Sequence, residues 1–313
     1  MLIIAVVVFS LSLVSARPSP FLGFGQTSSS ASTTPLSQDT ISATLLKPAR
    51  FSQIAYCSTA AVKAWDCGAP CQSVPDIKVL LASGDNADIP DFYVAYDPSS
   101  QTLVIAHQGT DPENIQSIAN DVALGLTPIS STEFPSAPSG VKVHKGFQET
   151  FLRTSSQITS LVSKSLTSQS PGPITNVLVT GHSLGAAIAV MDAIDIKTNI
   201  LTGSLTGIKL DCVVFGLPRG GNQDWANFVD QTLGTSLSHT SNKNDPIPTL
   251  PPLFLSFQHP SGEIHITTSG DNVACPGQEN KNCSDGNSVA DDKLSDHDGP
   301  YFGVEMGSDA CTA

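Results

Sequence analysis

The chain has 313 residues with 15 Lys or Arg and 28 Asp or Glu, so its formal net charge is −13. This acidic balance excludes nucleic acid as a default partner, because phosphate binding needs an excess of positive charge, and it disfavours docking on anionic membranes. Hydrophobic residues make up 40% of the chain and charged residues only 14%, which excludes wholesale disorder and allows a large buried core.

The first 16 residues are typical of a secretory signal peptide. Residues 2–14 are apolar apart from two serines, and small residues precede a predicted cleavage site after Ala16. No stretch reaches the roughly 20 apolar residues that a membrane span needs. Residues 17–45 contain a segment rich in Ser, Thr and Gly, which predicts a flexible leader or propeptide. The sequence therefore predicts a secreted, extracellular protein, without integral membrane association, whose single domain covers residues 46–313.

Helix and strand patterns alternate along this domain, as judged from the spacing of apolar residues. Repeated strand–helix units predict an α/β fold with a mainly parallel sheet covered by helices on both faces, and with functional sites at the carboxyl ends of the strands. In chain order the predicted elements are a helix over 48–58, a hairpin with strands over 92–96 and 102–106, a helix over 147–168, a strand over 177–179, a helix over 186–196, a strand around Cys212, a helix near Trp225 and Phe228, and a strand over 236–240.

A G-x-S-x-G motif, Gly181-His182-Ser183-Leu184-Gly185, lies between a predicted buried strand and the helix that follows it. In this setting the motif predicts a tight, strained turn that exposes Ser183 above the sheet as a nucleophile. The backbone N–H of Leu184 then points to the place where a substrate oxyanion forms. The alternative is a glycine-lined packing turn without chemistry.

A nucleophilic serine needs a histidine base and an acid that orients it, and in this type of sheet the chain order is serine, acid, histidine. Asp245 follows a predicted strand, and Pro246 keeps it extended in a rigid loop. His297 lies in a polar loop that is free to reach the serine. The candidates that the pattern places less well are Asp211 at the start of a strand, Asp230 in a helix, His259, and His265 between two isoleucines of a strand.

A second oxyanion donor is expected at the end of an earlier strand, where Thr110 follows Gly109. Residues 111–121 come directly afterwards and show one apolar face at helical spacing. They are predicted to form a lid over the pocket, with an ordinary surface helix as the alternative. Leu253-Phe254-Leu255 is interpreted either as the lining of an acyl groove or as part of the core.

Seven cysteines leave at least one thiol unpaired in an oxidising compartment. Cys212 lies in an apolar strand and is expected to be a buried free thiol. The irregular spacing argues against a zinc site. Local spacing favours two short-range bridges and leaves one long-range pair, so the predicted disulfides are Cys67–Cys71, Cys275–Cys283 and Cys57–Cys311.

From about Pro48 to Cys311 the chain resembles the fungal class 3 lipase family. The resemblance implies an α/β-hydrolase fold, a triad of Ser183, Asp245 and His297, the oxyanion donors Thr110 and Leu184, and hydrolysis of acylglycerols without a metal or cofactor. The predicted disulfides also match the usual bridges of that family. The segments that carry the resemblance are Gly109-Thr110, Val143-His144-Lys145-Gly146-Phe147, the G-x-S-x-G motif, Gly216-Leu217-Pro218-Arg219, Gly221-Asn222, Asn244-Asp245-Pro246-Ile247-Pro248 and Asp296-His297 with Tyr301-Phe302-Gly303.

Two further segments, His107-Gln108-Gly109-Thr110 and His259-Pro260-Ser261-Gly262-Glu263, resemble the basidiomycete branch that includes mono- and diacylglycerol lipases. The sequence thus predicts a monomeric serine hydrolase that cleaves acylglycerols at a lipid–water interface through an acyl-enzyme. One alternative is an esterase that acts on soluble or cell-wall esters, similar to feruloyl esterases. Another is a catalytically silent binding protein, against which the intact triad argues.

Overall fold

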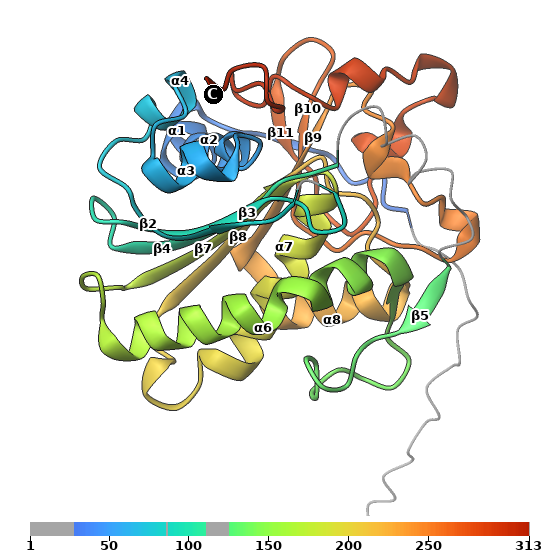
Figure 1. Cartoon of the computed structure of the whole chain (residues 1–313). Helices are drawn as coiled ribbons and strands as arrows, with labels where there is room; N and C mark the ends of the chain where they lie inside the picture. Colours follow the sequence, from blue (N-terminus) through green and yellow to red (C-terminus); the bar gives the residue numbers. More distant parts are fainter. Residues whose placement is uncertain (1–27, 86, 111–124, 313) are drawn as a thin grey trace, which may run out of the picture.

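The computed structural model describes residues 28–85, 87–110 and 125–312. The predicted signal peptide and the predicted lid at 111–121 lie outside these ranges. A nine-stranded sheet forms the centre of the fold, with helices on both faces (Figure 1). In spatial order its strands are β1 (Thr34–Pro35), β11 (Asn272–Ala274), β10 (Glu263–Ile266), β9 (Leu237–Asn242), β8 (Lys209–Phe215), β7 (Asn176–His182), β4 (Thr102–His107), β3 (Phe92–Asp97) and β2 (Lys78–Ser83).

The five middle strands β10, β9, β8, β7 and β4 are parallel to one another, whereas both edges of the sheet are antiparallel. The prediction of a mainly parallel sheet is therefore confirmed. A separate two-stranded ribbon consists of β5 (Leu126–Pro128) and β6 (Lys142–His144). Because parallel strands all end at the same edge, the loops after β4, β7, β8 and β9 meet there.

The helices form two groups on opposite faces of the sheet (Figure 1). One face is covered by α1 (Gln38–Thr44), α2 (Leu46–Ile54), α3 (Thr59–Ala64) and α4 (Ala69–Gln72), and the other by α6 (Lys145–Ser168), α7 (Leu184–Asp195) and α8 (Gln223–Leu233). The predicted helices at 48–58, 147–168 and 186–196 correspond to α2, α6 and α7 with small shifts at their ends. The predicted strands all occur.

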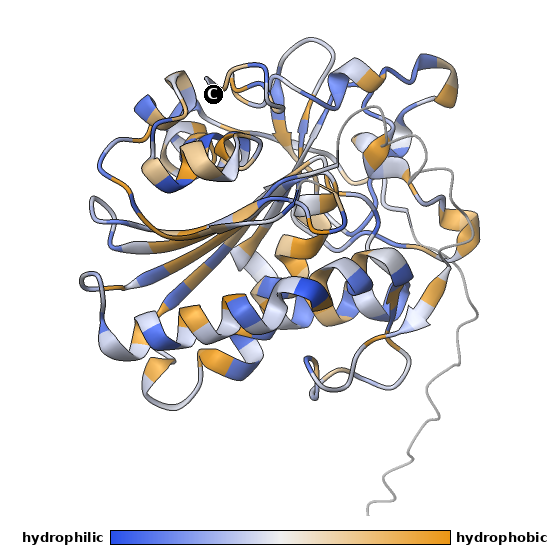
Figure 2. Ribbon diagram, in the orientation of Figure 1, coloured by the Kyte–Doolittle hydropathy of each residue, from blue (hydrophilic) through white to orange (hydrophobic). Residues whose placement is uncertain are grey.

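Each face of the sheet has its own hydrophobic core. Along β3, Val94 packs in the core beneath α6 and α7, whereas its neighbours Tyr93 and Ala95 pack in the core beneath α2. This alternation follows from the pleat, which directs successive side chains to opposite faces. Figure 2 shows both hydrophobic and hydrophilic residues along the strands and along α6. The buried residues of α6 recur every three or four positions, as expected for a helix with one face on the core.

The expectation of a flexible leader up to residue 45 is wrong for residues 34–45. Thr34 and Pro35 pair with β11, and Ser37 caps the start of α1, with its side chain accepting a hydrogen bond from the backbone N–H of Thr40. Ile41 is buried in the core beneath α2. Ser and Thr serve here as capping and turn residues, so a composition rich in them does not distinguish a flexible linker from an ordered segment of turns and a capped helix.

The structure contains the three predicted disulfides, and Cys212 is a buried free thiol. Burial raises the pKa of the Cys212 thiol well above its usual value, and the nearby Asp192 raises it further. Cys57–Cys311 joins residues 254 positions apart and attaches the end of the chain to the α2–α3 region. Among the described residues, no helix is both long enough and apolar enough to cross a membrane.

Candidate active site

Ser183 lies in the tight turn between β7 and α7 that the sequence predicts. Its backbone has φ 58° and ψ −127°, a region that residues other than glycine rarely adopt. The turn requires glycine on both sides, because a Cβ on Gly181 would lie 2.4 Å from the carbonyl oxygen of Gly185, and a Cβ on Gly185 would lie 2.5 Å from that of His107. The strain at Ser183 is thus imposed by the close approach of β7, α7 and the end of β4.

The side chain of Ser183 is only 3% exposed, so the expectation of a solvent-exposed serine is wrong. The strand end after β4 lies directly against it, since a Cβ on Gly109 would be 2.8 Å from the Cβ of Ser183. The next residue, Thr110, has a buried hydroxyl oxygen with no hydrogen-bond partner among the described residues. Thr110 and Leu184, the two predicted oxyanion donors, therefore both adjoin the serine, one through Gly109 and the other as its neighbour in the chain.

The side chains of Asp245 and His297 are in direct contact. His297 Nδ1 lies 2.8 Å from Asp245 Oδ2, and both side chains are buried. The other carboxylate oxygen of Asp245 accepts the backbone N–H of Ile247 at 2.9 Å. Because Nδ1–H donates to the carboxylate, His297 presents Nε2 as its proton acceptor, which is the tautomer that a general base needs.

The end of β8 brings Ser183 and His297 to the same place. The backbone N–H of Ser183 donates to the carbonyl oxygen of Phe215 at 3.0 Å. A Cβ on the next residue, Gly216, would lie 2.7 Å from Cε1 and 3.0 Å from Nδ1 of His297. Within the described part of the chain, the buried Nε2 of His297 has no hydrogen-bond partner. The imidazole of His297 therefore packs against Gly216, and the preceding residue, Phe215, binds the backbone of Ser183.

Two residues that the sequence does not single out, His182 and Tyr301, hold the main chain of His297. His182 Nε2 lies 2.9 Å from the carbonyl oxygen of His297, and Tyr301 donates its hydroxyl to the same oxygen at 3.0 Å. On its other side, His182 Nδ1 is 2.6 Å from the hydroxyl of Tyr56. Burial lowers the pKa of His182 well below its usual value, and the neighbouring His297 lowers it further, so the imidazole is neutral. The signal available in the sequence was that His182 occupies the second position of the G-x-S-x-G motif.

A second buried pair joins the end of β4 to α7. His107 Nε2 lies 2.7 Å from Asp192 Oδ2, and both side chains are almost fully buried. His107 precedes Gln108, Gly109 and Thr110, so this pair connects the strand end beside Ser183 to the helix that the serine begins. No motif in the sequence pointed to Asp192, which lies on a helix face that periodicity predicts to be apolar.

The candidates that the sequence placed less well have structural roles. His265 is buried in β10 with Nδ1 2.8 Å from the hydroxyl of Ser241, and Asp230 accepts hydrogen bonds from Ser261. Phe254 is 81% exposed, so this residue is not part of the core. Within the described ranges, one group has the spacing of a metal site, Glu263 with Cys275 and Cys283, but the two sulfur atoms are joined in a disulfide and offer no thiolate.

The chain falls in the class of α/β hydrolases that carry a serine at a strand-to-helix turn. Residues 104–255 match the model of the family described as lipase (class 3). The chain is 34% identical over 238 residues to the secreted mono- and diacylglycerol lipase LIP2 of Malassezia restricta, which covers 75% of this chain and 72% of that protein. The chain belongs to the class 3 lipase family.

Solved structures support the same fold. A triacylglyceride lipase of Rhizomucor miehei superposes with a TM-score of 0.74 at 28% identity, over 88% of this chain and 99% of that chain. A triacylglycerol lipase whose catalytic centre is described as a serine protease triad also superposes with a TM-score of 0.74, at 29% identity and with the same coverage of both chains. The predicted α/β-hydrolase fold and the predicted family are both confirmed.

Proposed function

We propose that this protein hydrolyses acylglycerols with Ser183 as nucleophile, His297 as general base and Asp245 as the residue that orients the base. The observation that carries the proposal is the buried 2.8 Å hydrogen bond between His297 Nδ1 and Asp245 Oδ2, at the strand edge where Ser183 occupies a strained turn. Strained serines and buried Asp–His pairs at the same edge are the arrangement that nucleophilic catalysis requires.

In the proposed reaction, His297 Nε2 takes the proton of Ser183 as the serine oxygen attacks the ester carbonyl. The N–H groups of Leu184 and Thr110 stabilise the tetrahedral oxyanion, and each such donor lowers the activation barrier by about 3 kcal/mol. His297 then protonates the leaving glyceride oxygen. Water, deprotonated by the same imidazole, releases the fatty acid from Ser183, and no metal or cofactor takes part.

The proposed substrates are mono- and diacylglycerols in preference to triacylglycerols, at a lipid–water interface. The support for this preference is the relative named as a mono- and diacylglycerol lipase. The exposed Phe254, between Leu253 and Leu255 in the loop region that follows Asp245, supports contact with an apolar phase. The net charge of −13 favours a neutral glyceride surface over an anionic membrane. We further propose that the enzyme acts as a monomer.

Secretion is supported by the relative named as a secreted lipase and by the three disulfides, which persist in oxidising compartments. We propose that the signal peptide is residues 1–16. N-terminal sequencing of protein collected from culture medium tests the cleavage site, and a start at Arg17 is the expected result.

Hydrolysis of emulsified mono-, di- and triacylglycerols of one acyl length, compared with short soluble esters, tests the substrate proposal. Release of fatty acid should be fastest from the mono- and diacylglycerols and absent with Ser183→Ala. Preference for soluble or feruloyl esters would instead make the protein an esterase of the same fold. Full activity of a folded Ser183→Ala variant would refute the proposed nucleophile.

A further inference from the structure

The loop that begins at Asp245 is held by a continuous series of hydrogen bonds to its main-chain carbonyl oxygens. We define the Asp245 loop as residues 245–251. Four consecutive carbonyl oxygens at its end, those of residues 248–251, each accept a hydrogen bond from Arg219 or His259. The bonds run from Arg219 Nη1 to the oxygens of Thr249 and Pro251 (3.2 Å for Pro251), from the backbone N–H of Arg219 to Leu250 (2.8 Å), and from His259 Nε2 to Pro248 (2.7 Å).

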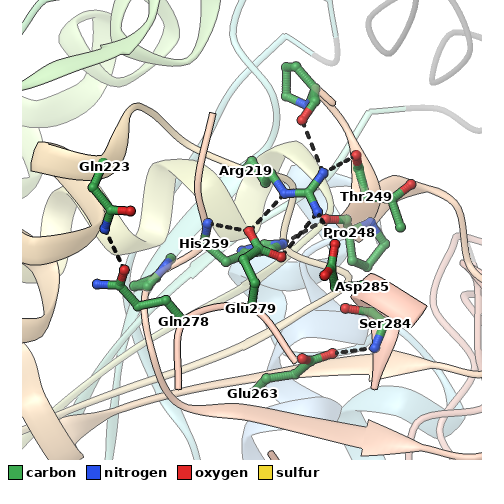
Figure 3. A network of polar contacts seen from close by, with 12 residues as sticks. Arg219, Gln223, Pro248, Thr249, His259, Glu263, Gln278, Glu279, Ser284 and Asp285 are labelled. Atoms are coloured by element: carbon green, nitrogen blue, oxygen red, sulfur yellow. Dashed lines mark hydrogen bonds and ion pairs between the residues drawn. The ribbon is translucent and has the colours of Figure 1, made fainter. Parts of the chain in front are cut away.

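Arg219 lies in the segment after β8, and its side chain is only 2% exposed. A buried cation needs a counter-ion, because the desolvation penalty is otherwise large. Glu279 supplies it through two hydrogen bonds, from Arg219 Nε at 2.9 Å and from Nη2 at 3.1 Å, and Asp285 lies 3.3 Å from Nη2 (Figure 3). With the two carbonyl oxygens on Nη1, all five guanidinium N–H donors have acceptors.

Glu279 joins both residues that hold the loop. Besides pairing with Arg219, its Oε1 accepts the backbone N–H of His259 at 2.8 Å (Figure 3). Burial lowers the pKa of His259 well below its usual value, so the ring is neutral, and the carbonyl it contacts requires the hydrogen to be on Nε2. One carboxylate therefore holds both residues that donate to the four carbonyl oxygens, Arg219 to three of them and His259 to the fourth.

The position of Glu279 is itself fixed from two directions. The loop that carries it is closed by the disulfide Cys275–Cys283. The residue Ser29, near the described start of the chain, donates its N–H to the carbonyl oxygen of Glu279 at 2.6 Å and accepts the N–H of Lys281 at 2.8 Å. The N-terminal segment thus packs on the support of the Asp245 loop.

We propose that Arg219, with Glu279 as its buried counter-ion, is a positioning residue for the Asp245 carboxylate. The proposal rests on the role of Asp245 in the function proposed above. Among the described residues, the hydrogen-bond and ion-pair partners of the Arg219 side chain are Thr249, Pro251, Glu279 and Asp285, and not Asp245 or His297. Arg219 holds the turn of residues 247–249, whose first N–H binds Asp245 Oδ1. Arg219 Nη1 donates to the oxygens of residues 249 and 251 while Nε and Nη2 donate to carboxylates; a lysine ammonium has only three donors on one nitrogen, so lysine is not an equivalent replacement.

The test is Arg219→Lys, with Arg153→Lys as the matched control, since Arg153 is an exposed arginine of α6. The probe is p-nitrophenyl butyrate, a soluble ester, and circular dichroism verifies that each variant is folded at the assay temperature. Arg219→Lys should lower kcat about 10- to 100-fold with KM changed less than about twofold, because orientation of the base affects the transition state and not binding. A loss no larger than that of Arg153→Lys would overturn the proposal.

A double-mutant cycle with Asp245→Asn separates positioning from general destabilisation. If Arg219 acts through Asp245, adding Arg219→Lys to Asp245→Asn should cost less than about twofold further in kcat. A further loss equal to that in the wild-type background would mean that Arg219 acts elsewhere, and would overturn the proposal. If Asp245→Asn and Ser183→Ala themselves leave kcat unchanged, it is the proposed triad that fails.

Glu279→Gln is the second variant, for use if Arg219→Lys does not fold. Glutamine keeps an acceptor for Arg219 and for the N–H of His259 but removes the negative charge. It should lower kcat at least about fivefold with KM unchanged and be non-additive with Asp245→Asn in the same way. Wild-type kcat in folded Glu279→Gln would contradict the proposal.

Discussion

His182 Nε2 lies 2.9 Å from the carbonyl oxygen of His297, so the residue beside the nucleophile holds the main chain of the base. The two imidazole rings are 4.4 Å apart between their centroids. Because His182 is buried and neutral, its single N–H is committed to that carbonyl. The turn at Ser183 and the position of His297 are therefore coupled through one side chain, although the two residues are far apart in the sequence.

Replacing His182 should weaken catalysis without abolishing it. His182→Leu removes the donor to the carbonyl oxygen of His297, so kcat on a soluble ester should fall about 10- to 100-fold, with KM little changed. His182→Gln retains an N–H donor and should recover most of the loss. Equal kcat for the two variants would show that the hydrogen bond is not what matters at this position.

Ser183 should show the conflict between stability and function that a strained nucleophile implies. Ser183→Ala and Ser183→Gly should both lower kcat about a millionfold. Glycine tolerates the backbone at φ 58° whereas alanine does not, so the glycine variant should be more stable by about 1 kcal/mol, or a melting temperature about 2–4 °C higher. Scanning calorimetry compares the two, and equal melting temperatures would contradict the strain.

Stability should decrease as the pH falls below about 6.5, the unfolded pKa of histidine. Burial lowers the pKa of His182, His239, His259 and His265, so these rings take up protons at a lower pH in the folded protein than in the unfolded chain. At pH 5.5 each of these histidines lowers the free energy of unfolding by up to about 1.4 kcal/mol. Asp195 opposes this below its own pKa of about 6, which burial raises, because there the folded state binds the extra proton.

Urea unfolding between pH 7.5 and 5.5 measures this dependence. His239→Gln is the informative variant, because glutamine keeps a donor toward the carbonyl oxygen of Pro260 but does not titrate. The slope of the free energy of unfolding against pH measures the number of protons taken up on unfolding. His239→Gln should reduce that number by up to one. A stability that is flat or rises on acidification over this range would show that the buried histidines are protonated in the folded protein.

The N-terminal segment should be required for stability. A chain that begins at Leu46 lacks the buried side chains of Ile41 and Leu45 and the pairing of β1 with β11. It should lose about 4 kcal/mol of stability relative to a chain that begins at Ser28. Thermal unfolding of the two proteins compares them, and identical melting temperatures would mean that residues 28–45 behave as the detachable leader that their composition suggests.

The one free thiol should be unreactive until the protein unfolds. Cys212 is buried and its pKa is raised, so its thiolate is scarce and inaccessible in the folded state. A thiol reagent such as DTNB should label no cysteine in the native protein and one per chain in guanidinium. Rapid labelling of the native protein would contradict the burial of Cys212 or the three disulfides, and non-reducing peptide mapping would distinguish these.

Features that depend on neighbours along the chain could be predicted from the sequence. The order of strands and helices follows from apolar spacing, and the turn at Ser183 follows from two glycines between a strand and a helix. The position of Asp245 after a strand indicates the candidate acid, and the polar loop around His297 favours this residue as the base. The short disulfides followed from local spacing. In each case the physical cause acts within about ten residues.

Features that depend on residues far apart in the chain could not be predicted from the sequence and are visible only in the folded protein. The pairing of Thr34 and Pro35 with β11, the pair of His107 with Asp192, and the ion pair of Arg219 with Glu279 each join residues separated by 60 positions or more. A buried arginine or aspartate looks the same in a sequence as an exposed one, because the partner that offsets its desolvation is supplied by the fold.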